Sequence, residues 1–197
     1  MPRIAEIREP AEPSSAGQQR RYESILRAAS RLGREQELER VQMADVAKEA
    51  GVAIATLYRY FPSKVHLFAG VLRERLLRLD ASVEAGPDDV DPVTAAGDLL
   101  IDNMRGMLAE PVLALSMLTA NNVAQTQASG ESRFIDRRFE QLLLRVARFE
   151  EPTPDERRRG RLLMQCWFGV LMSALNGRST PAEAELDIRR ACELLLG

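Results

Sequence analysis

The chain has 197 residues, of which 45% are hydrophobic and 28% are charged, and its formal net charge is −2. This length is enough for one large core or for a small domain and a larger one, and the composition is that of a globular protein. A membrane protein is not expected, because the longest apolar run, residues 162–175, contains Gln165 and is too short to cross a bilayer.

The N-terminal segment, residues 1–18, is predicted to be a flexible arm. It is rich in proline, serine and charged residues and contains little apolar material. Because it lacks the apolar stretch of a secretion signal, a cytoplasmic location is expected.

After the arm, the hydrophobic spacing predicts helices and no convincing strand, so the expected fold class is all-α. Gly51 is expected to end the second helix, Pro62 the third, and Ser63 to cap the fourth, which runs toward Asp80. Turn-rich stretches at residues 84–92 and 125–131 are expected to connect later helices. The predicted helices cover residues 19–33, 43–50, 54–61, 64–80, 93–109, 111–124, 131–150, 154–177 and 181–196.

The second and third helices are short and joined by a turn at Gly51, which is the helix-turn-helix pattern of proteins that read the DNA major groove. On the third helix, Leu57 and Phe61 are four residues apart and can face the core. This spacing predicts that Thr56, Arg59 and Tyr60 project outward, with Tyr58 at the boundary between the two faces. An alternative is a short aromatic helix in an all-α protein that binds no DNA.

The outward residue types suit DNA contact. Hydroxyl groups of Thr56 and Tyr58 can donate to phosphate oxygens, and Arg59 can bond bidentately to a guanine edge. Lys64 lies at a helix N-terminus, where its charge and the free backbone N–H groups both favour a phosphate. The first eighty residues are also net basic and the remainder net acidic, which suits a small DNA-contacting part joined to a larger body.

The string GVAIATLYRYFPSK at residues 51–64, preceded by VQMADVAKEA, resembles the signature of the TetR family of transcriptional regulators. The resemblance implies an all-helical homodimer that binds double-stranded DNA at a palindromic operator. It implies a DNA-binding domain at residues 19–66 and an effector-binding and dimerisation domain at residues 67–197. The implied DNA contacts are Arg20, Arg21, Gln42, Met43, Ile54, Ala55, Thr56, Tyr58, Arg59, Tyr60 and Lys64.

The resemblance also assigns roles to these residues. Phosphate contacts fall on Thr56, Tyr58 and Lys64, while base contacts come from Ile54, Ala55, Arg59 and Tyr60. Gln42 and Met43 would touch the backbone or a thymine methyl group.

The chain departs from the family pattern at two positions. Ala53 stands where family members often have serine or threonine, so the third helix lacks a side-chain cap worth about 1 kcal/mol. Ala55 stands where many members have glycine, which puts the bases that are read in doubt.

A dimer interface is predicted on the last two helices. Gly169, Ser173 and Gly177, spaced by four, form a small-residue seam that would let another helix approach closely. Together with Leu186 and Leu194, predicted to point inward from the last helix, the seam is typical of a four-helix dimer interface. The alternative is the core helix of a monomer.

A methionine-rich set in the helical body is the candidate effector pocket, because thioethers adapt to bulky apolar ligands. Ordinary core packing is the alternative for most of its members. The asparagines of the set would orient a ligand through polar contacts. The predicted pocket consists of Asn103, Met104, Met107, Leu108, Met117, Asn121, Phe139, Met164, Trp167, Phe168 and Leu171.

Within the family, the chain is most similar to the actinobacterial repressors of cholesterol and steroid catabolism. This similarity implies a repressor released by a small hydrophobic effector, an acyl-CoA or a steroid acid thioester. The alternative function is a helix-turn-helix protein that binds DNA without an effector and has an architectural or partner-binding role.

No enzymatic activity, metal or cofactor is expected. The chain has one histidine, His66, without an evident nucleophile or carboxylate partner nearby in sequence. Cys166 and Cys192 lie among leucines and aromatic residues and have no metal-ligand spacing. Both are therefore predicted to be buried free thiols.

Overall fold

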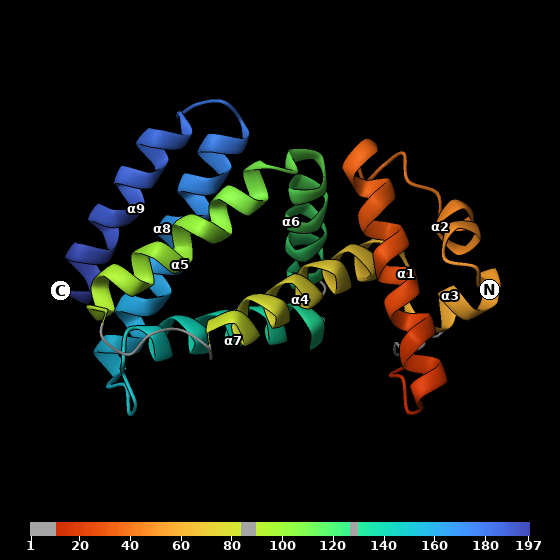
Figure 1. Cartoon of the computed structure of the whole chain (residues 1–197), viewed down its shortest axis with the longest axis horizontal. Coiled ribbons are helices and arrows are strands. Elements are labelled where there is room, and N and C mark those ends of the chain that lie inside the picture. Colours follow the sequence, from red (N-terminus) through yellow and green to blue (C-terminus); the bar gives the residue numbers. More distant parts are fainter. Residues whose placement is uncertain (1–10, 84–89, 127–129) are drawn as a thin grey trace, which may run out of the picture. The chain divides into compact units, whose positions relative to one another are not determined.

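The computed structural model describes residues 11–83, 90–126 and 130–197. Every regular element of these residues is a helix, which confirms the all-α prediction (Figure 1). The helices are α1 (Ala16–Glu35), α2 (Met43–Glu49), α3 (Ile54–Tyr60), α4 (Lys64–Val83), α5 (Pro92–Leu108), α6 (Pro111–Thr126), α7 (Gly130–Val146), α8 (Pro154–Leu175) and α9 (Pro181–Leu196). Of the predicted connections, residues 84–89 and 127–129 lie outside the described residues.

These helices form two compact units. The first contains the described residues up to Glu74 together with Val112–Ser132, and the second contains Arg75–Pro111 and Arg133–Gly197. Helix α4 contributes residues to both units. The predicted division assigned all residues after 66 to the body, whereas here most of α6 groups with the N-terminal helices.

In the core of the first unit, α1 packs closely against α4 and α6 at Gly33. Leu26 of α1, Leu57 of α3 and Phe68 of α4 are all buried. At Gly33 of α1, an added Cβ would stand 2.6 Å from Phe68 Cε1 and 2.9 Å from Leu113 Cδ1. Glycine at this position therefore lets α1 lie close to α4 and α6.

Helix α1 begins earlier than expected. The Ser15 hydroxyl accepts a hydrogen bond from the Gln18 N–H, so α1 starts at Ala16. The last three residues of the predicted arm are therefore helical, and its first ten residues lie outside the described part of the chain.

The ends of α2 and α7 are set by residues with positive φ. Gly51, with φ of 68°, ends α2 as predicted, and the Val52 N–H donates to the Ala47 carbonyl. Arg148, with φ of 57°, follows the end of α7, and the Phe149 N–H donates to the Leu144 carbonyl. This turn ends α7 at Val146, four residues before the predicted end.

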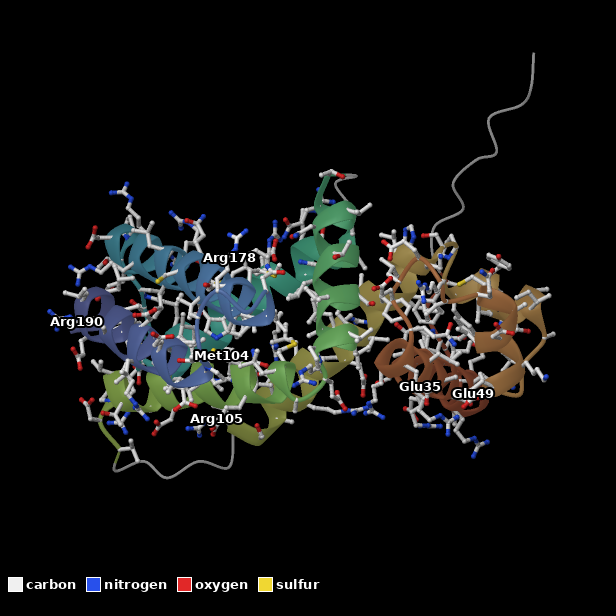
Figure 2. The ribbon with its side chains drawn as sticks, turned by 90° about the horizontal axis from the view of Figure 1, so that it is seen from above. Glu35, Glu49, Met104, Arg105, Arg178 and Arg190 are labelled. Atoms are coloured by element: carbon white, nitrogen blue, oxygen red, sulfur yellow. The ribbon has the colours of Figure 1, made fainter. Side chains whose placement is uncertain are left out.

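The core of the second unit lies between α5, α8 and α9. Leu100 of α5, Leu171 of α8 and Ile188 of α9 are buried, and the Trp167 Nε1–H donates to the Leu100 carbonyl at 2.9 Å. Figure 2 shows Met104 inside this unit, while Arg190 projects from its edge.

A buried acid lies in the body part of α4. The Asp80 side chain is 3% exposed and forms ion pairs with Arg138 and Arg145 of α7. The two arginines are seven residues apart, so they lie on one face of their helix. Asp80 thus joins α4 to α7 inside the second unit.

The two cysteines differ in exposure. Cys192 is buried, and this burial raises the pKa of its thiol to about 11. Cys166 is exposed, so the prediction that both thiols are buried is wrong for this residue. Its position on α8 belongs to an outer face of that helix, which the sequence pattern assigned to the core.

Two kinds of feature are absent from the part of the chain that the structure describes. No helix in residues 11–83, 90–126 or 130–197 is long and apolar enough to cross a membrane. Over the same residues, no group of three histidine, cysteine, aspartate or glutamate side chains is arranged to hold a metal ion.

Candidate nucleic-acid interface

Helix α3 has a buried face and an exposed face. Leu57 and the following Phe61 are buried in the first unit, as predicted. Ile54, with 42% of its surface exposed, and Tyr58, with 48%, lie one turn apart on the outer side. Two large side chains thus face solvent from a short helix whose opposite face is fully packed.

The remaining predicted DNA contacts of α3 differ in exposure. Ala55 and Arg59, also one turn apart, are exposed, and Thr56 is half-buried. Ala53 precedes the helix and makes no side-chain capping bond, as expected for alanine. The exposed residues form a surface that combines apolar groups, a phenol and a guanidinium, which are the groups that contact base edges and phosphates.

Tyr60 does not project outward, so the prediction that it contacts bases is wrong. Only 1% of its surface is exposed, and its ring packs edge-on against Tyr22 with the centroids 5.7 Å apart. The physical reason is helical spacing: Tyr60 lies three residues after Leu57 and shares its inward face. Tyr22 also contacts Phe61, at 4.9 Å between centroids.

Arg59 lies over the buried tyrosine. Its Nη2 donates to the Tyr60 hydroxyl at 3.0 Å, and its Cζ stands 4.9 Å from the centroid of the Tyr60 ring. The backbone carbonyl of Arg59 accepts a hydrogen bond from the Ala11 N–H at 3.1 Å. The end of the arm is therefore attached to the C-terminal end of α3.

Lys64 lies in the first turn of α4, and its side chain is tethered. Its Nζ donates to the Glu39 carbonyl at 2.8 Å, which links α4 to the segment between α1 and α2. Ser63 caps α4 as predicted, and its hydroxyl lies 2.9 Å from His66 Nδ1. Partial burial lowers the pKa of His66.

The predicted contacts outside α3 and α4 are exposed, with one exception. Arg20, Arg21 and Gln42 are exposed. Met43 is buried, with 8% of its surface exposed, so its predicted contact with DNA is wrong. It lies three and four residues before Val46 and Ala47 and completes the inner face of α2 with them.

Sequence reasoning missed the contacts that hold this surface in place. The Glu39 carbonyl and the Ala11 N–H are backbone groups, and no residue type signals their position. The role of Tyr22 could have been found, because an aromatic residue on the apolar face of α1 is a natural partner for the aromatic residues at the end of α3.

Most of the predicted pocket residues lie in the second unit. Met104, Met107 and Leu171 are buried, and the rings of Phe139 and Trp167 meet at 5.2 Å between centroids. The more exposed members, each half-buried, are Asn103, Leu108, Met164 and Phe168.

Two predicted pocket residues, Met117 and Asn121, belong to the first unit. Both are buried. Asn121 Oδ1 has no hydrogen-bond partner among the residues that the structure describes. A buried amide oxygen without a partner is uncommon in folded proteins, and the role of Asn121 in orienting a ligand stays a prediction.

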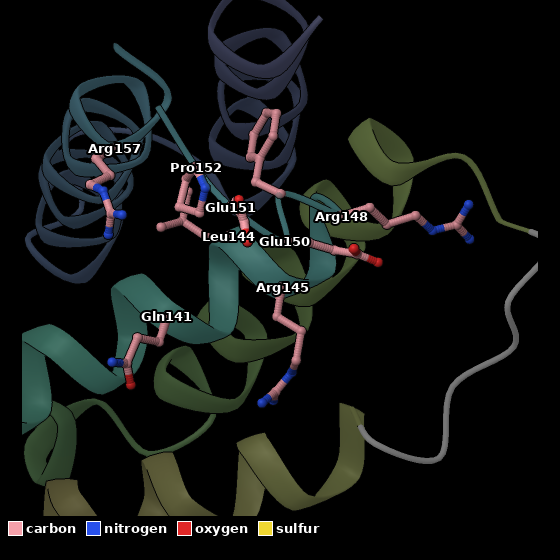
Figure 3. A pocket seen from close by; sticks show the side chains of 9 residues that line it. Gln141, Leu144, Arg145, Arg148, Glu150, Glu151, Pro152 and Arg157 are labelled. Carbon is pink, nitrogen blue, oxygen red and sulfur yellow. The ribbon is translucent and has the colours of Figure 1, made fainter. Parts of the chain in front are cut away.

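The second unit also has an open hollow of about 940 Å³ where α7 leads into α8 (Figure 3). It differs from the predicted pocket in its lining, which combines arginines and glutamates with Leu144, Phe149 and Pro152. The predicted effector pocket is not this hollow.

An exposed apolar face lies on α8 and α9. Leu186 is 69% exposed, Leu194 is 65% exposed and Leu162 is 46% exposed. The expectation that Leu186 and Leu194 point inward is therefore wrong, because both side chains are exposed on the single chain. Gly169 is exposed, with no atom within 4 Å of where its Cβ would stand. Their exposure leaves these residues accessible to a second copy.

The small-residue seam is shorter than predicted. Ser173 is half-buried, and its hydroxyl accepts a hydrogen bond from the Ser179 hydroxyl at 3.1 Å. Gly177 lies beyond the end of α8, with φ of 68°, and the Arg178 N–H donates to the Ser173 carbonyl. Gly177 is therefore the stop of α8 and not part of the helical seam.

Comparisons with known proteins agree with this architecture. The model of bacterial regulatory proteins of the tetR family matches residues 25–71, and the model of the tetracyclin repressor-like C-terminal domain matches residues 90–195. A crystal structure of a TetR transcriptional regulator from Rhodococcus sp. RHA1 superimposes with a TM-score of 0.85 at 43% identity, covering 91% of this chain and 97% of that one.

Curated relatives carry the name HTH-type transcriptional repressor KstR. The protein of Rhodococcus jostii is 33% identical over 184 residues, which are 93% of this chain and 86% of that protein. The protein of Mycobacterium tuberculosis is 30% identical over 188 residues, 95% of this chain and 86% of that protein. This chain therefore belongs to the TetR family and is a helix-turn-helix transcriptional repressor similar to KstR, a DNA-binding protein and not an enzyme.

Proposed function

We propose that the protein is a ligand-responsive repressor that leaves a palindromic operator when a hydrophobic effector binds its second unit. The observation that carries this proposal is the exposed face of α3, where Ile54, Tyr58 and Arg59 face solvent from a packed three-helix head. The proposed role places the protein in the cytoplasm, where bacterial DNA lies.

The side chains of this surface are assigned to two kinds of DNA contact, with bases and with phosphates. Arg59 and the apolar groups of Ile54 and Ala55 are the base-reading residues, because they suit guanine edges and thymine methyl groups. Phosphate contacts come from Thr56, Tyr58 and Lys64, with Gln42, Arg20 and Arg21 at the margins of the surface.

Replacing Tyr58 with phenylalanine and Lys64 with alanine together is expected to weaken binding to all DNA sequences alike. The loss of one positive charge at a phosphate should lower the slope of log affinity against log salt by about 1. Fluorescence anisotropy with operator and with unrelated duplexes at several salt concentrations measures this slope. Arg105→Ala, which removes one charge from the second unit, serves as the matched control; an equal slope in the double variant and the wild type would refute these contacts.

The homodimer is proposed to form through the exposed face of α8 and α9 that carries Leu162, Gly169, Leu186 and Leu194. A two-fold axis at this face would make the operator palindromic, because each α3 would enter one of two major-groove segments about 34–36 Å apart. The exposed leucines support this interface, since they are large apolar side chains that the isolated chain leaves uncovered.

The effector is proposed to be a small hydrophobic molecule, an acyl-CoA or a steroid acid thioester. The buried Met104 and Met107 and the paired rings of Phe139 and Trp167, all in the second unit, support this. Thioethers and aromatic rings can rearrange around a bulky apolar group. Since α4 contributes residues to both units, a shift of α4 on ligand binding would change the separation of the two α3 helices. Such coupling typically amounts to about 1–3 kcal/mol.

Titration with steroid acyl-CoA and fatty acyl-CoA thioesters is expected to change the emission of Trp167 and to release operator over the same concentration range. Trp167 is the only tryptophan of the chain, and its buried indole lies within the proposed ligand site. Free coenzyme A is the control and should do neither. Operator binding that no thioester affects, together with constant emission, would instead favour the alternative of an effector-independent DNA-binding protein.

A further inference from the structure

We propose that Tyr60 is a positioning residue that holds the Arg59 guanidinium in place for base reading. The inference rests on the proposed base-reading role of Arg59. It gives Tyr60, which is too deeply buried to touch DNA, a role in operator specificity.

Tyr60 provides a fixed support because its ring is held on several sides. It is 1% exposed, and it meets the ring of Tyr22 edge-on at 5.7 Å between centroids. Tyr22 in turn contacts Phe61 at 4.9 Å. A side chain packed in this way has one rotamer, so its hydroxyl group has one position.

Arg59 is bound to this support through two different interactions. Its Nη2 donates to the Tyr60 hydroxyl at 3.0 Å, and its Cζ stands 4.9 Å from the ring centroid. The hydrogen bond fixes the direction of the guanidinium, and the cation–π contact fixes the height of the side chain above the ring. The exposed arginine is therefore held although it lies at the surface.

The arrangement leaves the arginine able to read a base. A guanidinium carries five N–H donors. When one of them donates to the Tyr60 hydroxyl, others remain for the two acceptors of a guanine edge. An arginine that is already oriented loses less rotamer freedom when it binds. Holding Arg59 should favour the correct base, because only a base in the matching place can reach the fixed donors.

The test is a double-mutant cycle on operator binding with Tyr60→Phe, Arg59→Ala and the combined variant. Tyr60→Phe keeps the ring and removes only the hydroxyl group. We expect it to lower operator affinity about two- to tenfold, to leave affinity for unrelated DNA unchanged, and to relax preference at the base pair that Arg59 reads. In the Arg59→Ala background the same change should have no further effect.

Tyr22→Phe is the control, because it removes a hydroxyl group from the neighbouring ring and leaves the contact between Arg59 and Tyr60 intact. Its ratio of operator to non-specific affinity should equal that of the wild type, whatever its melting temperature. Equal effects of Tyr60→Phe in both backgrounds, or equal losses on operator and unrelated DNA, would overturn the positioning role. If Arg59→Ala itself leaves base preference unchanged, the base-reading assignment in the proposed function fails instead.

Discussion

Replacing Asp80 with asparagine is expected to lower the free energy of unfolding of the second unit by about 3 kcal/mol. The Asp80 side chain is 3% exposed and is paired with Arg138 and Arg145, whose side chains are 39% and 45% exposed. Asparagine would leave two partly buried guanidinium groups without their counter-charge. Urea denaturation followed by Trp167 emission measures this loss, because Trp167 lies in the same unit.

The matched control for this variant is Asp102→Asn. Asp102 pairs with Arg105 on the surface of α5, where its side chain is 71% exposed, so its loss should cost less than about 1 kcal/mol. Equal and small losses for the two variants would show that the carboxylate of Asp80 does not hold α4 to α7. The DNA contacts of the first unit do not enter this comparison.

Replacing both Leu186 and Leu194 with glutamate is expected to give a monomer whose operator affinity is lower by about 100-fold or more. Two of the most exposed leucines of the chain lie at these positions, 69% and 65% exposed, and a buried glutamate at each would oppose association. A monomer binds one half-site at a time and loses the advantage of two linked contacts. Sedimentation velocity and operator titration measure the two effects.

Val123→Glu is the control for the dimer variant. Val123 is an exposed apolar residue of α6 and belongs to the first unit, whereas the proposed dimer face belongs to the second. It should leave both the sedimentation coefficient and the operator affinity unchanged. If the leucine variant stays dimeric, the interface between copies lies elsewhere.

Helical spacing predicted the helices, but it failed where two helix faces meet. The period placed Leu57 and Phe61 inside correctly. It also allowed Tyr60, three residues from Leu57, to be placed outside, because tyrosine suits either the core or a DNA surface. Only its packing against Tyr22 decides between the two positions.

The interactions that join distant segments were beyond the reach of the sequence pattern. Asp80 continues the buried spacing of Leu72 and Leu76 along α4, so a buried acid could have been suspected. Its partners on α7 could not, because their pairing depends on how two helices pack. The tie between Lys64 and the Glu39 carbonyl likewise depends on the folded backbone.

The candidate pocket shows a different limit of prediction from sequence. The methionine-rich set was chosen for its chemistry, and the structure packs Met104, Met107 and Leu171 as core. Apolar side chains that enclose a ligand and those that fill a core follow the same helical spacing. Helical spacing cannot tell whether these side chains enclose a ligand or only fill the core, so ligand titration has to decide it.

The most direct test of the account is selection of genomic DNA fragments by the purified protein at moderate salt, followed by a search for a shared motif. A dimeric repressor that reads bases through α3 predicts one palindromic motif, with base preference lost at defined positions in Arg59→Ala. Fragments that share no motif, bound equally well by the wild type and by Arg59→Ala, would contradict sequence-specific operator binding through α3.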